Sequence, residues 1–174
     1  MQYLFLMLGY PGSGKSTFSE QLAQDFGWLR FNTDEARRYM FTTEAETVDV
    51  KLNPYVNGAL DYATEVALDA GFSVVNDSNH NLAQSRQKLK IVATQCGAKT
   101  IVIRMKTPLR VAKQREVNRR LESDYIAISD ERYDVLVGLL EEPTNDELTI
   151  SIDGEANYTD QLKSFKEQLD NINQ

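Results

Sequence analysis

Apolar runs alternate with helix-like patterns along the whole chain. The apolar runs predict five strands, at Tyr3–Leu8, Trp28–Asn32, Phe72–Asn76, Thr100–Met105 and Leu148–Ile152. Strands that alternate with helices are typical of a parallel sheet with helices packed on it. The sequence therefore predicts an α/β fold with a mainly parallel five-stranded sheet flanked by helices.

Residues that commonly end or begin helices support this alternation. Glycines that close a helical pattern just before a strand are Gly27, Gly71 and Gly97. Polar residues that could cap the start of a helix are Asn53, Asn81, Thr107 and Ser129. Two apolar stripes with helical spacing are predicted to pack on the sheet: Phe18, Leu22 and Phe26, and Val56, Leu60, Ala63 and Ala67.

Composition bounds the class of protein. The chain has 174 residues, 41% of them hydrophobic and 26% charged, which predicts one globular domain over residues 1–174. Its formal net charge of −7 disfavours a long nucleic-acid track, because such tracks need clustered Lys and Arg. A binding site for a polyanion must therefore be local.

The expected cellular location follows from the absence of export and membrane signals in the sequence. The single cysteine, Cys96, cannot form an intrachain disulfide and suggests a reducing compartment. The apolar run at Tyr3–Leu8 has no basic residue before it, and no segment is long enough to span a bilayer. We expect a cytoplasmic protein without a membrane partner.

A glycine-rich phosphate loop follows the first predicted strand. Residues 9–17 read Gly-Tyr-Pro-Gly-Ser-Gly-Lys-Ser-Thr and open a predicted helix, as a Walker A motif does. The backbone amides and helix start would bind phosphates, Lys15 would reach the β and γ phosphates, and Ser16 would bind magnesium. We expect ATP and Mg²⁺ as cofactors. The predicted nucleotide-binding residues are Gly12, Ser13, Gly14, Lys15, Ser16 and Thr17.

A second acidic motif follows the third predicted strand. Asp77 comes after Val74-Val75-Asn76, as a Walker B aspartate does, and could hold magnesium together with Ser16. The alternative is that Asp77 only caps a helix. Ser78 follows where hydrolytic enzymes often have Glu, which favours transfer to a bound acceptor over hydrolysis.

Asp34 and Arg37 follow the second predicted strand. Asp34 would emerge at the same sheet edge as the phosphate loop, where a carboxylate could take the proton of an acceptor hydroxyl. Arg37 lies one helical turn further and could bind charge on the acceptor. The alternative for Asp34 is a helix cap.

A basic segment in this acidic chain predicts a helical lid over residues 107–130. Arg115 and Arg119 are four residues apart and share a helix face, so both could reach a bound triphosphate. We predict that Arg115 binds the nucleotide and that Arg119 is a catalytic arginine. Arg120 adjoins them, and the segment from Ser123 to Ser129 could be the tip of the lid. The alternative is a solvated helix face.

Together these motifs resemble the polynucleotide 5′-hydroxyl kinase and zeta-toxin-like group of P-loop kinases, small AAA-type ATP-binding domains. The phosphate loop, the Asp34-x-x-Arg37 motif and Asp77-Ser78-Asn79 with Arg86 carry the resemblance. It implies that Arg86 binds substrate, and it supports the roles given above to the aspartate base and to the arginine of the lid.

These features predict an ATP-dependent kinase that phosphorylates a hydroxyl group. The first candidate acceptor is a nucleic-acid 5′-hydroxyl, and the alternatives are a nucleotide sugar or another small hydroxyl metabolite. A different class, an ATP-dependent regulatory or interaction module, also stays open. The sequence lacks the Asn-Lys-x-Asp and Asp-x-x-Gly motifs of GTPase switches.

Overall fold

The computed structural model describes residues 1–42, 50–119 and 128–174. Its strands form one five-stranded sheet in which every neighbouring pair is parallel, in the order β2-β3-β1-β4-β5. The strands are β1 (Tyr3–Leu8), β2 (Leu29–Asn32), β3 (Val74–Asp77), β4 (Lys99–Lys106) and β5 (Thr149–Asp153). The predicted fold class is confirmed, and each predicted strand lies within a few residues of its observed position.

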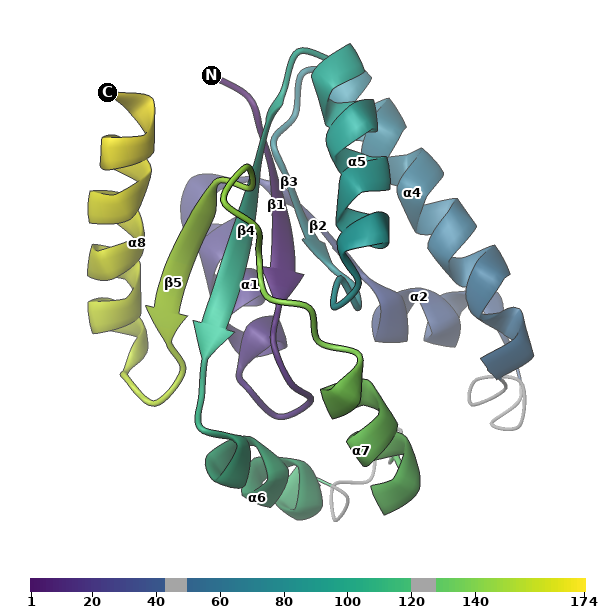
Figure 1. The fold of residues 1–174 in the computed structure, drawn as a ribbon. Helices are drawn as coiled ribbons and strands as arrows, with labels where there is room; N and C mark the ends of the chain where they lie inside the picture. The colour runs from purple at the N-terminus through teal and green to yellow at the C-terminus, as the bar shows by residue number, and fades with distance from the viewer. Residues whose placement is uncertain (43–49, 120–127) are drawn as a thin grey trace.

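Helices cover both faces of the sheet (Figure 1). They are α1 (Lys15–Phe26), α2 (Thr33–Met40), the 3₁₀ turn η1 (Val50–Leu52), α4 (Asn53–Asp69), α5 (Ala83–Gln95), α6 (Leu109–Arg119), α7 (Asp130–Gly138) and α8 (Tyr158–Asn173). Helices α1 and α8 pack on one face, and α4 and α5 pack on the other. Helices α6 and α7 lie beyond the carboxyl ends of the strands (Figure 1).

Each face of the sheet has its own hydrophobic core. The alternate residues Phe5 and Met7 of β1 enter the larger core, which α1 and α8 complete. Leu4 and Leu6 point to the smaller core under α4 and α5. All six residues of β1 are buried, which is typical of the central strand of a parallel sheet with two covered faces.

Helices begin within two residues of all four predicted starts, but only one of the four polar side chains acts as a cap. Ser129 caps α7, where its Oγ accepts a hydrogen bond from the Arg132 amide at 3.2 Å. Asn53 is the first residue of α4, and neither α4 nor α5 has a side-chain cap. Thr107 and Asn81 instead form tertiary hydrogen bonds, to Ser13 O at 2.8 Å and Leu136 O at 3.2 Å respectively.

The cap of α8 gives a test of local stability. Asn157 Oδ1 accepts a hydrogen bond from the Asp160 amide at 3.1 Å. Asn157→Ala is expected to lower the free energy of unfolding by about 1 kcal/mol, since it leaves a first-turn amide without its acceptor. Urea denaturation measures this change. Asn157→Ser is the control because it keeps a capping oxygen, and an equal loss in both variants would contradict the role of the cap.

No helix within the described ranges is long and apolar enough to cross a membrane.

Candidate nucleotide and phosphoryl-transfer site

The phosphate loop connects β1 to α1 at the carboxyl edge of the sheet. Gly12 and Gly14 have φ angles of +78° and +94°, a region that glycine enters without steric cost. The Ser13 amide donates a hydrogen bond to Tyr10 O at 3.0 Å. A Cβ at position 12 would overlap the Ala112 carbonyl of α6, so the loop and α6 are in direct contact.

Lys15 begins α1 and folds back over the loop. Its Nζ donates hydrogen bonds to Gly9 O and Tyr10 O, both at 2.8 Å. Burial lowers the pKa of Lys15 to about 8, although the negative charges of Asp77 and Asp34 oppose this shift. The lysine of the phosphate loop therefore lies within the electrostatic reach of both predicted functional aspartates.

The lowered pKa predicts a pH dependence of nucleotide binding. Near pH 8 about half of the Lys15 side chains are neutral in the free protein, and a bound polyphosphate favours the charged form. ATP binding is therefore expected to take up protons at this pH, and its affinity should fall as the pH rises further. Calorimetry in two buffers with different ionisation enthalpies measures the uptake.

Lys15→Arg is the matched control, because a guanidinium stays charged across this pH range. Proton uptake should disappear in that variant. Identical binding heats in the two buffers for the unmodified protein would contradict a pKa near 8.

Asp77 ends β3 beside the phosphate loop. Its Oδ2 accepts hydrogen bonds from Arg30 Nη2 at 2.8 Å and from Asn32 Nδ2 at 2.6 Å. These two contacts fix the orientation of the carboxylate. Because Asp77 belongs to a strand and α5 begins six residues later, it does not cap a helix.

Asp34 lies in the first turn of α2, at the end of β2. Asn32 is the cap of this helix, since its Oδ1 accepts a hydrogen bond from the Glu35 amide at 3.0 Å. Asp34 is thus not needed as a cap, and the residue as a whole lies at the surface of the molecule. Desolvation of its carboxyl group by the surrounding protein, together with the nearby negative charge of Asp77, raises the pKa of Asp34. The raised pKa makes Asp34 a better proton acceptor at neutral pH than an ordinary Asp.

Three arginine charges act on the Asp34 carboxylate. The positive charges of Arg37, Arg119 and Arg38 all act on it and oppose the rise of its pKa. Arg37 comes from the same helix, and its side chain is buried. Arg119 is the last residue of α6, which lies in the predicted lid. The end of α6 and the first turns of α2 are therefore close enough for the charges of Arg119 and Asp34 to interact.

Arg115 lies over the phosphate loop. Its Nη1 donates a hydrogen bond to Gly154 O at 2.8 Å and would lie 4.0 Å from a Cβ placed on Gly14. This position is compatible with contact to a nucleotide. Arg120 and most of the predicted lid tip lie outside the described residues.

Arg86 is not placed to bind substrate, which corrects the expectation from the resemblance. Its side chain is 1% exposed and forms a bidentate ion pair with Glu147, at 2.7 and 2.9 Å. Its Nη1 also donates to the carbonyl oxygens of His80, Asn81 and Glu141. Arg86 therefore joins three chain segments behind the site and is a structural residue.

Several residues around the phosphate loop were missed from sequence. Arg104 stacks on the Tyr10 ring, with Cζ 5.5 Å from its centroid, and pairs with Glu142 at 2.6 Å. Tyr133 of α7 donates to Pro11 O at 3.4 Å, and burial raises the pKa of its hydroxyl to about 12. Arg104 could have been noticed in the sequence, because it is a charged residue at an inward position of a predicted strand. The sequence around Tyr133 has no comparable feature.

Magnesium fits this site as a partner of the nucleotide. Among the described residues, no group of three or more His, Cys, Asp or Glu side chains could hold a metal ion alone. Mg²⁺ is commonly held by one or two protein oxygens together with phosphates and water. Ser16 and Asp77 would supply those protein contacts, and the ion would neutralise phosphate charge.

This arrangement of sheet order, phosphate loop and strand-end aspartate defines a P-loop kinase-like domain. Residues 4–143 match the profile of a family described as an AAA domain, and the chain belongs to that family. The match supports an ATP-binding P-loop. It does not single out the polynucleotide kinase and zeta-toxin-like group, so that narrower assignment stays a prediction.

One curated relative and two solved structures extend the comparison. L-seryl-tRNA(Sec) kinase of Methanococcus maripaludis is 23% identical over 137 residues, which are 75% of this chain and 52% of that protein. The chain thus spans about half the length of this relative.

A putative kinase from Chloroflexus aurantiacus superposes with a TM-score of 0.76 at 16% identity, over 98% of this chain and 97% of that one. Chaetomium thermophilum Kti12, solved with ADP-AlF3, has a TM-score of 0.74 at 19% identity, over 96% and 97%. At these identities, the structures support the fold alone.

Proposed function

We propose that this protein is an ATP-dependent phosphotransferase that moves the γ-phosphate to an acceptor hydroxyl. The observation that carries the proposal is the position of Asp34, a carboxylate with a raised pKa whose charge reaches Lys15 of the phosphate loop. A base in that position can accept the hydroxyl proton while the oxygen attacks the γ-phosphate.

Each remaining group has a role in this reaction. Lys15 and the loop amides bind the phosphates, and Ser16 with Asp77 positions Mg²⁺. Arg115 binds the nucleotide and Arg119 stabilises charge in the transition state. Because Arg119 also acts on Asp34, the lid helix links the nucleotide to the acceptor.

The surroundings of Asp34 favour an acceptor with negative charge near its hydroxyl. Three arginines act on this carboxylate, and arginine binds phosphate well. The 5′ end of a nucleic acid is the first candidate, since it presents a hydroxyl beside phosphodiesters. The name of the M. maripaludis relative, an L-seryl-tRNA(Sec) kinase, is compatible with an RNA-linked acceptor. A nucleotide sugar is the second candidate, and a neutral sugar fits the arginines less well.

The test is transfer of labelled γ-phosphate from ATP with magnesium to a panel of acceptors. The panel contains 5′-hydroxyl RNA and DNA oligonucleotides, seryl-tRNA, nucleotide sugars and neutral sugars. Labelling of a phosphate-bearing acceptor would support the proposal, and labelling of neutral sugars alone would contradict the inferred acceptor charge. ATP binding that alters partner association without transfer to any acceptor would favour the regulatory module.

A further inference from the structure

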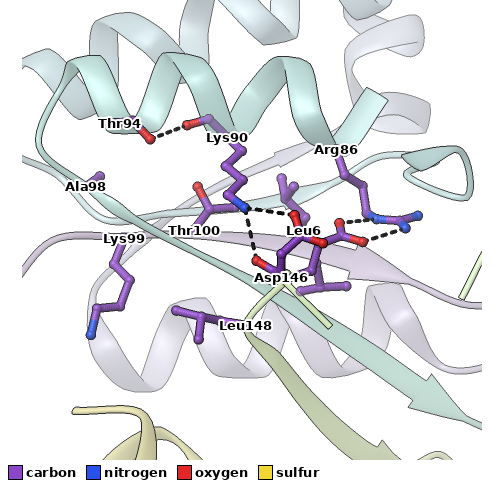
Figure 2. A pocket seen from close by; sticks show the side chains of 11 residues that line it. Leu6, Arg86, Lys90, Thr94, Ala98, Lys99, Thr100, Asp146 and Leu148 are labelled. Carbon is purple, nitrogen blue, oxygen red and sulfur yellow. Dashed lines mark hydrogen bonds and ion pairs between the residues drawn. The ribbon is translucent and has the colours of Figure 1, made fainter. Parts of the chain in front are cut away.

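Arg30 and Arg86 each bind a carboxylate from a distant part of the chain. Arg86 pairs with Glu147 in the wall of a cavity between α5 and β4, away from the phosphate loop (Figure 2). Arg30 of β2 instead reaches Asp77, at the carboxyl edge of the sheet. The partners of Arg30 belong to the elements that carry the predicted metal ligands and the predicted base.

The Arg30 guanidinium connects three elements at this edge. Its Nη2 donates to Asp77 Oδ2 at 2.8 Å, and its Nη1 donates to Glu35 Oε1 at 2.6 Å. Its Nε donates to Ser19 Oγ at 3.0 Å, and that hydroxyl donates to Ser16 O at 3.0 Å. Arg30 therefore binds one predicted magnesium ligand directly, the backbone of the other through Ser19, and the first turn of α2.

A second path joins Asp77 to the same turn of α2. Asn32 Nδ2 donates to Asp77 Oδ2 at 2.6 Å, and Asn32 Oδ1 accepts from the Glu35 amide at 3.0 Å. Glu35 is thus held through its side chain by Arg30 and through its backbone by Asn32. A displacement of the Asp77 carboxylate would act on Glu35 through both paths, and so on Asp34 beside it.

The two ends of the Arg30 bridge differ in exposure. The side chain of Asp77 is 2% exposed and that of Arg30 is 12% exposed, whereas that of Glu35 is 51% exposed. Breaking the buried pair with Asp77 from one side is costly, but an exposed pair contributes little to stability. The Glu35 end can therefore be removed without unfolding the protein.

We propose that Arg30 is a positioning residue that couples the magnesium and nucleotide site to α2. This inference rests on the proposed function, which assigns Asp77 to the metal and Asp34 to the acceptor. When α2 opens locally, Glu35 releases Arg30, and the Asp77 carboxylate loses part of its support. A ligand that needs Asp77 in its observed orientation binds the intact arrangement better and, by linkage, stabilises α2. Nucleotide with metal thus orders the helix that carries the base.

The test measures hydrogen exchange of backbone amides in the full chain, with AMP-PNP as the nucleotide. AMP-PNP with magnesium is expected to slow exchange at residues 12–17 and also in α2, there by about fivefold or more. AMP-PNP with EDTA should protect the phosphate loop but protect α2 less, because the coupling runs through the metal ligands. Equal protection of α2 with and without magnesium would overturn the proposal.

Substitutions at Glu35 separate this coupling from direct contact between nucleotide and α2. Glu35→Met removes the acceptor of Arg30, so α2 should lose most of its magnesium-dependent protection while residues 12–17 stay protected and the melting temperature changes little. Glu35→Gln should keep part of that protection, because its amide oxygen can still accept from Arg30. Unchanged protection of α2 in Glu35→Met would overturn the proposal.

Two further variants complete the comparison. Arg30→Met should lose the same protection, with a lower melting temperature because Asp77 is left without its cation. Lys88→Met breaks the exposed pair with Asp61 and is the matched control, which should leave the protection of α2 unchanged.

These measurements need no acceptor, so they separate the role of Arg30 from the proposed reaction. Coupling without phosphoryl transfer to any acceptor would support the role of Arg30 and count against the kinase reaction. Transfer without magnesium-dependent protection of α2 would support the reaction and contradict the coupling. AMP-PNP that protects neither segment would contradict both.

Discussion

Asp34→Asn is expected to lower the rate constant of phosphoryl transfer by about 10²- to 10⁴-fold, the usual contribution of a general base. The amide keeps the size of the side chain but cannot accept the proton of the acceptor hydroxyl. ATP affinity should stay within a few-fold of normal, because the phosphate loop is untouched. Single-turnover transfer and equilibrium ATP binding measure the two quantities separately.

The pH profile gives this prediction a second readout. Since the pKa of Asp34 lies above its ordinary value, the activity should fall on the acid side at a higher pH than for an ordinary Asp. That acid limb should vanish in Asp34→Asn. Asp170→Asn, at an exposed position in α8, is the matched control and should leave rate and profile unchanged. Full activity in Asp34→Asn would exclude the assigned base.

Loss of the Arg86 guanidinium should have the largest effect on stability among the changes considered. Arg86→Met removes the partner of Glu147 and the donor to three backbone carbonyls. Breaking a buried ion pair from one side costs about 3–5 kcal/mol, which corresponds to a fall in melting temperature of roughly 10 °C. Thermal and urea unfolding measure the loss.

Acid unfolding should change in the same variant. The hydrogen bonds from Arg86 hold the pKa of Glu147 below its ordinary value. This pair therefore contributes stability above the ordinary Glu pKa that is lost as the pH falls through the lowered one. Arg86→Met should weaken that dependence.

Lys88→Met is the matched control for Arg86→Met. Lys88 lies on the same helix and pairs with Asp61, but its side chain is 64% exposed. Its loss should cost no more than about 1 kcal/mol. Equal destabilisation by the two variants would contradict the structural role of Arg86.

The fold and the phosphate loop could be predicted because their signals are local. Buried parallel strands appear as apolar runs, and Gly12, Gly14 and Lys15 lie within one short segment. The position of Asp34 followed from the rule that strand ends of a parallel sheet share an edge. These features depend on neighbouring residues or on fold-level regularities.

The errors concern side chains whose partners are distant in sequence. Thr107 and Asn81 have the chemistry of helix caps, but tertiary partners bind their side chains instead. Arg86 has the charge expected of a substrate ligand, yet Glu147 and three carbonyls surround it. Sequence shows which hydrogen bonds a side chain can form, and the packed structure decides which of them it forms.

The central position of β1 has a consequence for how the chain reaches this structure. Leu6 pairs with Asn76 on one side and with Val102 on the other, so both neighbouring strands are distant in the chain. During synthesis, the apolar segment Tyr3–Leu8 therefore leaves the ribosome long before either neighbour exists. Late non-local pairing slows folding and exposes apolar segments to aggregation. Nascent chains that stop before β4 should consequently depend on chaperones, and that dependence should ease once residues 99–106 have emerged.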